Sequence, residues 1–111
     1  MKFLLYTTGD NTQPSAPPTP QMIEEVGKFT EETRRAGILL ATGGLAPTTT
    51  RVRNAGGKLT VTDGPFTETK ELTGGFALVE VRTKEEAIEI GRRFLKIVGD
   101  GSSTIQEVFG P

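Results

Sequence analysis

Two short segments of this chain are apolar on both of their alternating faces, which constrains the fold more than any other feature. In Phe3–Tyr6 and in Gly75–Val81, successive side chains point to opposite sides, and both sides are apolar. Such segments are typical of central strands that are covered on both faces, whereas a strand with one solvent face alternates apolar and polar residues. The sheet that contains them therefore needs a covering layer on each side.

Two segments have the spacing of amphipathic helices. Thr19-Pro20 is an N-cap followed by proline at the first helical position, and Gly37 is placed to end this first helix. Thr83 and Glu86 have the spacing of a capping box, and Gly99 ends the apolar stripe that follows them. The remaining apolar segments are expected to be strands, at residues 2–8, 38–41 (broken by Gly43-Gly44), 50–53, 58–62, 75–81 and 104–109.

The expected order is β-α-β, a small hairpin, then β-α-β. With right-handed crossovers this order gives an α+β fold of the ferredoxin-like type, in which both helices lie on one face of the sheet. No third helix remains to cover the other face. We therefore expect a homodimer whose sheets face each other, because a symmetric dimer lets the same apolar patch cover itself.

Composition excludes several kinds of chemistry. The 111 residues include no cysteine and no histidine, which excludes disulfides, thiolate nucleophiles, Cys-ligated metals and imidazole chemistry. The length fits a single domain over residues 1–111. Because the three aspartates are scattered between segments, we expect no metal site, and no cofactor is expected either.

The charge argues against a polyanionic partner. With 13 basic and 14 acidic side chains the net charge is −1, too little for general binding to nucleic acid. Gly75–Val81 superficially follows the RNP1 pattern of RNA-recognition modules, but Leu78 and Val81 stand where base stacking needs aromatic rings. The apolar start of the chain is too short for a signal peptide or a membrane span. We expect a cytoplasmic protein with no nucleic-acid and no membrane partner.

A hairpin is expected in the middle of the chain, around a four-residue loop at Asn54–Gly57. Val52, Leu59 and Val61 then share one face. The other face carries Arg51, Arg53, Lys58 and Thr60. We expect Leu59 and Val61 to be buried, which would bring the residue after the second strand, Asp63, close to the end of a packed sheet.

The most distinctive stretch is Val61–Glu71, followed by Gly74–Phe76. It closely resembles the signature of the DGPF proteins, a branch of the YCII-related family, and the resemblance covers essentially the whole chain. It implies a ferredoxin-like fold that dimerises into an α/β-barrel-like assembly, with a cleft between sheet and loops. Members of this branch are often encoded beside, or fused to, sigma factors of the extracytoplasmic-function type, and their activity is mostly unassigned. Some YCII relatives carry a His–Asp pair proposed as catalytic, which a chain without histidine cannot use.

The motif has two interpretations. Asp63-Gly64-Pro65 is first a turn, in which the aspartate bonds to nearby backbone, and Phe66 anchors it to the core. Alternatively, its charges form a ligand site, with Asp63 as the best catalytic candidate. The residues expected at such a site are the polar partners Arg51, Glu68 and Lys70 around Asp63, and the walls Tyr6 and Phe66.

Two classes of function remain open at this point. The first is a small-molecule-binding protein or enzyme with a cleft near the Asp63 turn. The second is a non-catalytic regulatory or interaction module that acts with an extracytoplasmic-function sigma factor. The sequence identifies no ligand and no reaction.

Overall fold

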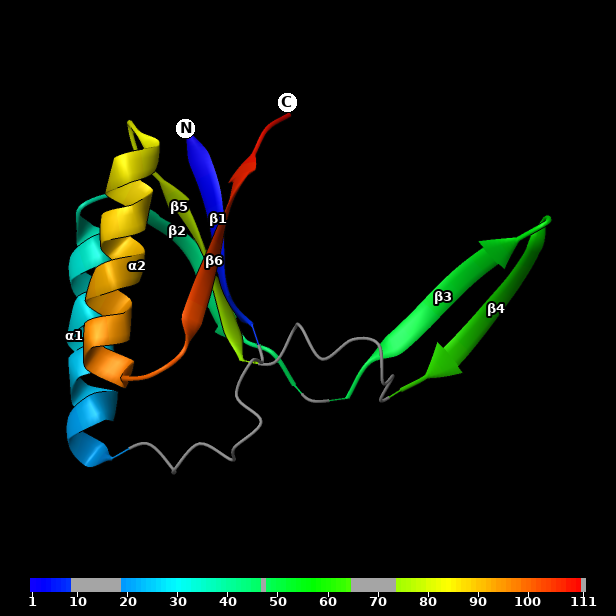
Figure 1. Ribbon diagram of the computed structural model, residues 1–111, viewed down its shortest axis with the longest axis horizontal. Helices are drawn as coiled ribbons and strands as arrows, with labels where there is room; N and C mark the ends of the chain where they lie inside the picture. Colours follow the sequence, from blue (N-terminus) through cyan, green and yellow to red (C-terminus); the bar gives the residue numbers. More distant parts are fainter. Residues whose placement is uncertain (9–18, 47, 65–73, 111) are drawn as a thin grey trace.

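The computed structural model describes residues 1–8, 19–46, 48–64 and 74–110 of the chain (Figure 1). In this part of the chain, six strands and two helices follow one another in the expected order. They are β1 (Lys2–Thr8), α1 (Pro20–Arg35), β2 (Leu39–Gly44), β3 (Thr50–Ala55), β4 (Lys58–Asp63), β5 (Gly75–Glu80), α2 (Lys84–Val98) and β6 (Ser102–Val108).

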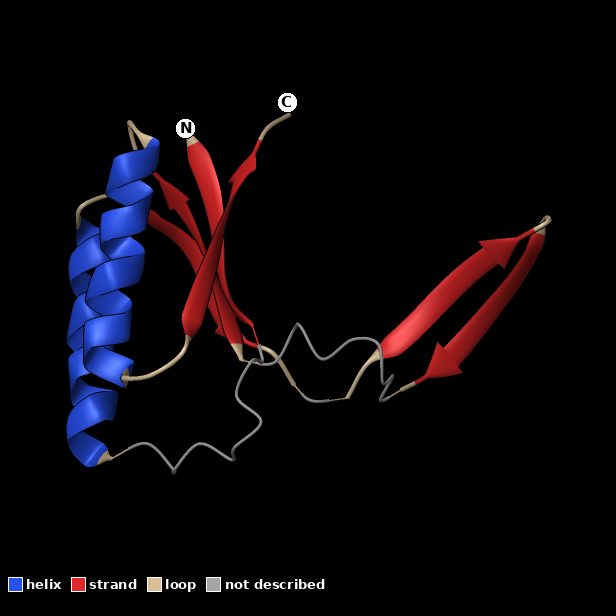
Figure 2. Cartoon of the chain, in the orientation of Figure 1, coloured by secondary structure: helices blue, strands red, loops and turns tan. Residues whose placement is uncertain are grey.

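Four of the strands form an antiparallel sheet in the order β2-β5-β1-β6, and both helices cover one face of it (Figure 2). This is the ferredoxin-like arrangement, so the predicted fold class is confirmed. The two segments with two apolar faces, β1 and β5, are the central strands, and Leu4 lies opposite Leu78 between them. The face without helices is called the open face below.

The core lies between the helices and the sheet. Alternation along β1 directs Phe3 and Leu5 toward the helices, and the partner strand contributes Val79, which is fully buried. The buried apolar residues are Phe3, Leu5, Phe29, Val79, Val81, Ala87 and Ile90. The two helices are joined at the surface by Arg93, whose guanidinium lies 4.7 Å from the centre of the Phe29 ring and binds both carboxylate oxygens of Glu32 at 3.1 Å.

The helix ends follow the sequence signals closely. The Thr19 hydroxyl accepts a hydrogen bond from the Met22 N–H at 3.1 Å, and Gly37, at φ 75°, ends α1 with the paired backbone bonds of a Schellman motif. Thr83 caps α2 by accepting from the Glu86 N–H at 3.2 Å. The Glu86 carboxylate accepts a hydrogen bond from the Arg82 N–H. In a capping box it would accept from the N–H of the N-cap residue, Thr83, so the observed bond lies one residue earlier in the chain.

The hairpin β3–β4 forms a separate two-stranded sheet. Its loop contains two residues, Gly56 at φ 59° and Gly57 at φ 82°, and not the four that were expected. These two glycines adopt the positive φ values that a tight two-residue hairpin loop requires. Because the pairing shifts by two residues, the faces are unchanged: Val52, Leu59 and Val61 do share one face.

The expected burial of Leu59 and Val61 is wrong for the single chain. Both side chains are about as exposed as Val52, because the hairpin extends away from the four-stranded sheet and no other described element packs on it (Figure 1). One strand boundary also differs, since β2 continues through Gly43-Gly44, which was expected to break it. These two glycines pair with β5, where the ring of Phe76 lies against Gly43.

Candidate functional site

A cavity of about 420 Å³ lies between the helices and the sheet. Its lining extends to the end of the sheet where β1 and β2 finish and β5 begins. The described residues that line it are Leu5, Tyr6, Thr7, Val26, Phe29, Thr30, Thr33, Leu39, Thr42, Gly43, Gly74, Gly75, Phe76, Ala77, Val79, Ile90, Phe94, Val98 and Ser103. Aliphatic and aromatic side chains dominate this lining, and none of these residues carries a carboxylate, an amine or a guanidinium.

Three of the threonine hydroxyls in the cavity wall donate their protons to backbone carbonyls. Thr30 donates to the carbonyl of Val26 at 2.7 Å, and Thr33, which is buried, donates to the carbonyl of Phe29 at 2.9 Å. On the sheet side, Thr42 donates to the carbonyl of Phe76 at 2.8 Å. A hydroxyl has one proton and two lone pairs. These three oxygens therefore remain available as hydrogen-bond acceptors.

Two consecutive glycines form the wall of the cavity where β5 begins. Gly74 has φ 129°, and a Cβ at this position would overlap the Thr7 hydroxyl. Next to it, the Gly75 N–H donates to that same hydroxyl at 3.1 Å, and a Cβ on Gly75 would lie 2.9 Å from the carbonyl oxygen of Gly43. Glycine is therefore required here both by the backbone angle and by the close approach of β1, β2 and β5.

Gly74→Ala is expected to destabilise the protein by about 1–3 kcal/mol, because alanine is strained at this φ and its Cβ displaces Thr7. The matched control is Gly27→Ala, in the interior of α1, where a Cβ meets nothing within 4 Å. That substitution is expected to stabilise by about 0.5–1 kcal/mol, since alanine is the better helix former. Urea denaturation of both variants measures the two changes, and equal effects of the same sign would contradict this account of Gly74.

Comparison with known proteins gives the family. The chain matches the family model described as the YCII-related domain over residues 1–108. The chain belongs to the YCII-related family. A curated relative, an uncharacterised protein of Rhizobium meliloti (strain 1021), is 41% identical over 59 residues, which cover 51% of this chain and 48% of that protein. This YCII-related chain thus spans about half the length of the curated relative that it matches.

A solved structure supports the fold of this YCII-related chain. It is the 5-chloro-2-hydroxyhydroquinone dehydrochlorinase from Burkholderia phenoliruptrix AC1100, in complex with 2,5-dihydroxybenzoquinone. The alignment has a TM-score of 0.50 and covers 100% of this chain and 96% of that one, at 14% identity. At that identity the likeness concerns the fold alone. Within the described residues, no helix is long and apolar enough to cross a membrane.

The structure brings together only some of the site residues that the sequence predicts. Asp63 and Arg51 both lie on the hairpin, but on opposite faces of it, because Asp63 pairs with Thr50 and Arg51 pairs with Thr62. Asp63 is exposed and accepts a hydrogen bond from the Thr50 hydroxyl at 2.9 Å. Phe66, Glu68 and Lys70, the other three members on this part of the chain, lie outside the described residues.

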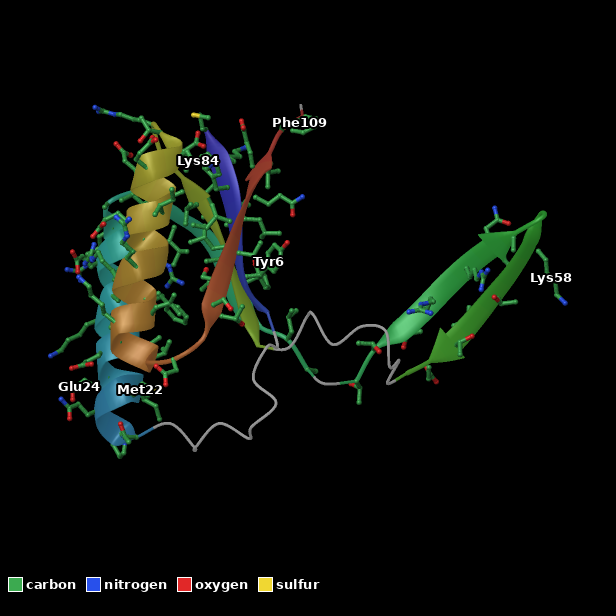
Figure 3. The ribbon with its side chains drawn as sticks, in the orientation of Figure 1. Tyr6, Met22, Glu24, Lys58, Lys84 and Phe109 are labelled. Carbon is green, nitrogen blue, oxygen red and sulfur yellow. The ribbon has the colours of Figure 1, made fainter. Side chains whose placement is uncertain are left out.

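Tyr6 lies on β1, apart from the hairpin (Figure 3). Its side chain points to the open face, where the hydroxyl donates to the side-chain oxygen of Gln106 at 3.2 Å. Tyr6 is also among the residues that line the cavity. Its role as a wall of a ligand site stays a prediction.

Sequence reasoning missed the threonines of the cavity wall. The sequence pattern identifies none of Thr30, Thr33 and Thr42 as a candidate site residue. A threonine at an apolar position is usually a core residue, and its pattern does not show whether its hydroxyl borders a cavity. The signal that was available is the spacing of Thr30 and Thr33, which places both on the sheet-facing side of one helix.

Asp63→Asn is expected to change the free energy of unfolding by less than about 0.5 kcal/mol, as substitutions at exposed positions usually do. The amide oxygen can still accept from Thr50, and only the charge is lost. Ligand affinity then separates the two roles of the motif: it is unchanged if Asp63 only shapes the turn, and it falls if the carboxylate binds ligand. Calorimetry measures the stability of the variant, and titration with ligand measures the affinity. A large loss of stability would contradict the exposed environment of this side chain.

Proposed function

We propose that this protein binds a small, uncharged aromatic molecule with hydroxyl groups in the cavity between its helices and sheet. The observation that carries the proposal is the combination of an apolar lining with hydroxyl oxygens that have already donated their protons. A cavity of about 420 Å³ is of the size that small-molecule sites usually have. Its lining buries an apolar ring favourably, at roughly 25 cal/mol per Å² of apolar surface removed from water.

The polar groups of the wall select the kind of ligand. Thr30, Thr33 and Thr42 offer lone pairs and no free proton in the described arrangement, so they favour a ligand that brings O–H donors. A carboxylate or phosphate would find no compensating charge among the described lining residues.

The proposal concerns binding and not catalysis. Among the described residues of the lining, Tyr6 is the one with an ionisable side chain, and its hydroxyl is directed to Gln106 on the open face. A hydrolase or isomerase of the usual kind needs an acid or base within hydrogen-bond reach of its substrate. The described part of the cavity supplies oxygen acceptors and shape, which suffice for recognition.

Thermal unfolding with a panel of ring compounds tests the proposal. Phenol and hydroquinone are the positive probes, toluene tests the apolar contribution alone, and benzoate tests the exclusion of anions. At 100 times its dissociation constant a ligand of the folded state stabilises by about 2.7 kcal/mol, so the hydroxylated rings are expected to raise Tm by roughly 10 °C.

Two results would overturn this function. One is a panel in which no hydroxylated ring raises Tm at millimolar concentration. The other is a larger shift with benzoate than with phenol, since this would require a cation in the site. Specific retention of an extracytoplasmic-function sigma factor, with no ligand-induced shift, would favour the regulatory module instead.

A further inference from the structure

One face of the β3–β4 hairpin is an exposed apolar stripe formed by Val52, Leu59 and Val61. Their side chains are 68%, 70% and 69% exposed in the single chain. Val52 pairs directly with Val61, and Leu59 follows on the same face, so the three side chains are contiguous. Isolated exposed apolar residues are ordinary, but three β-branched or leucine side chains in one stripe on a projecting hairpin form an interaction surface.

Within the part of the chain that the structure describes, the hairpin has no other element to support it. A two-stranded hairpin alone is marginally stable in water, and one that persists packs its apolar face on something else. No other described element of the chain covers the stripe, as Figure 1 shows, and Lys58 marks its far tip in Figure 3. A second molecule can supply the cover that the described residues do not.

The distribution of charge along the chain favours a second copy as the molecule that covers the stripe. The residues 50–63 hold three of the 13 basic side chains and one of the 14 acidic ones, so the hairpin carries +2 and the rest of the chain −3. The cations Arg51, Arg53 and Lys58 all lie on the face opposite to the stripe. The net charge of the hairpin is therefore opposite in sign to that of the remainder of a second copy, which favours their approach.

Position supports the same occupant. The hairpin lies on the side of the sheet away from the helices, which is the side of the open face (Figure 1). The open face carries the half-buried Leu4, Tyr6, Phe76 and Leu78, which no other described element covers. A second copy stacked on this face lies on the side toward which the hairpin projects.

We propose that the β3–β4 hairpin is an arm that each copy of the chain lays on a second copy, with Val52, Leu59 and Val61 as its contact surface. The arrangement is reciprocal, because a two-fold axis gives each chain one arm and one surface that receives the partner's arm. The arm fixes the relative position of two sheets that apolar stacking alone would leave free to slide. This interaction is independent of the ligand proposed for the cavity.

The direct test is an isotope-filtered NMR experiment on a mixed dimer. Chains with ¹³C-labelled methyl groups are mixed with unlabelled chains, and nuclear Overhauser effects from labelled methyls to unlabelled protons report contacts between chains alone. The methyl groups of Val52, Leu59 and Val61 are expected to show such contacts. If they show contacts within their own chain only, or none with either chain, the arm does not exist. A protein that remains monomeric at the concentration used also overturns the proposal.

A pair of charge-matched variants gives an independent readout. Val61→Asp places a carboxylate in the stripe, and Thr60→Asp adds the same charge on the neighbouring residue, which faces the opposite side. Both side chains are exposed in the single chain, so neither substitution disturbs a core. Sedimentation equilibrium is expected to show at least about a tenfold rise in the dimer dissociation constant for Val61→Asp, and less than about threefold for Thr60→Asp. Equal effects of the two variants would overturn the role of the stripe.

Discussion

Replacing Leu4 and Leu78 together by threonine is expected to dissociate the dimer proposed above into single chains. The two leucines lie opposite each other on the central strands, and their side chains point to the open face. Burying one leucine is worth about 1.5–3 kcal/mol, and a symmetric dimer buries each of them twice. Even with partial compensation by the threonine methyl groups, the dissociation constant is expected to rise at least about a thousandfold.

Light scattering at micromolar concentration measures the outcome. The parent protein is expected to have about twice the 11.9 kDa mass of one chain, and the double variant the mass of one chain. Threonine is a good strand former, so the far-ultraviolet circular dichroism should be retained. As a control, Ile23→Thr removes an apolar side chain that is 60% exposed on α1 and should leave the mass unchanged. A parent protein with the mass of one chain would contradict the dimer from the start.

The element order and the fold class could be predicted because they depend on local patterns. Alternation identified the central strands, a period near 3.6 identified the helices, and cap residues such as Thr19 and Thr83 located their starts. Only two helices were available, so their place on one face followed from chain connectivity. The loop length in the hairpin was missed by two residues, but this error preserves which side chains share a face.

The burial of Leu59 and Val61 could not be predicted in the same way. Alternation shows that one face of a hairpin is apolar, but it does not show what covers that face. The expectation that both side chains are buried is wrong for the single chain. The pattern itself was correct, and the stripe becomes intelligible when a second molecule supplies the cover.

The cavity could not be predicted from the sequence either, because a cavity is the space that several packed elements leave unfilled. Gly74-Gly75 stood out as part of a motif, but its requirement for glycine comes from Thr7 on a strand nearly 70 positions away. Likewise, the acceptor character of Thr42 depends on the carbonyl of Phe76 across the sheet. Such properties arise from contacts between distant segments, which periodicity does not encode.

Ala77→Leu is expected to abolish ligand binding while the protein keeps its fold and stability. Ala77 pairs with Leu5 in the sheet, packs against the core and lines the cavity, so a larger side chain at this position extends into the empty space. Filling a void adds contacts, whereas the same change in a closely packed core would cost about 1–3 kcal/mol. The expected melting temperature is therefore equal to or above that of the parent.

The effect of Ala77→Leu on ligand binding shows whether the ligand occupies the cavity or another site. The Tm increase of roughly 10 °C expected with hydroxylated rings should disappear in Ala77→Leu, because the added side chain occupies the space of the ring. Ala36→Leu makes the same change at an exposed position at the end of α1 that does not line the cavity, and it should bind normally. If Ala77→Leu remains folded and still binds the ring compounds as the parent does, the ligand lies elsewhere, and the Asp63 turn becomes the next place to test.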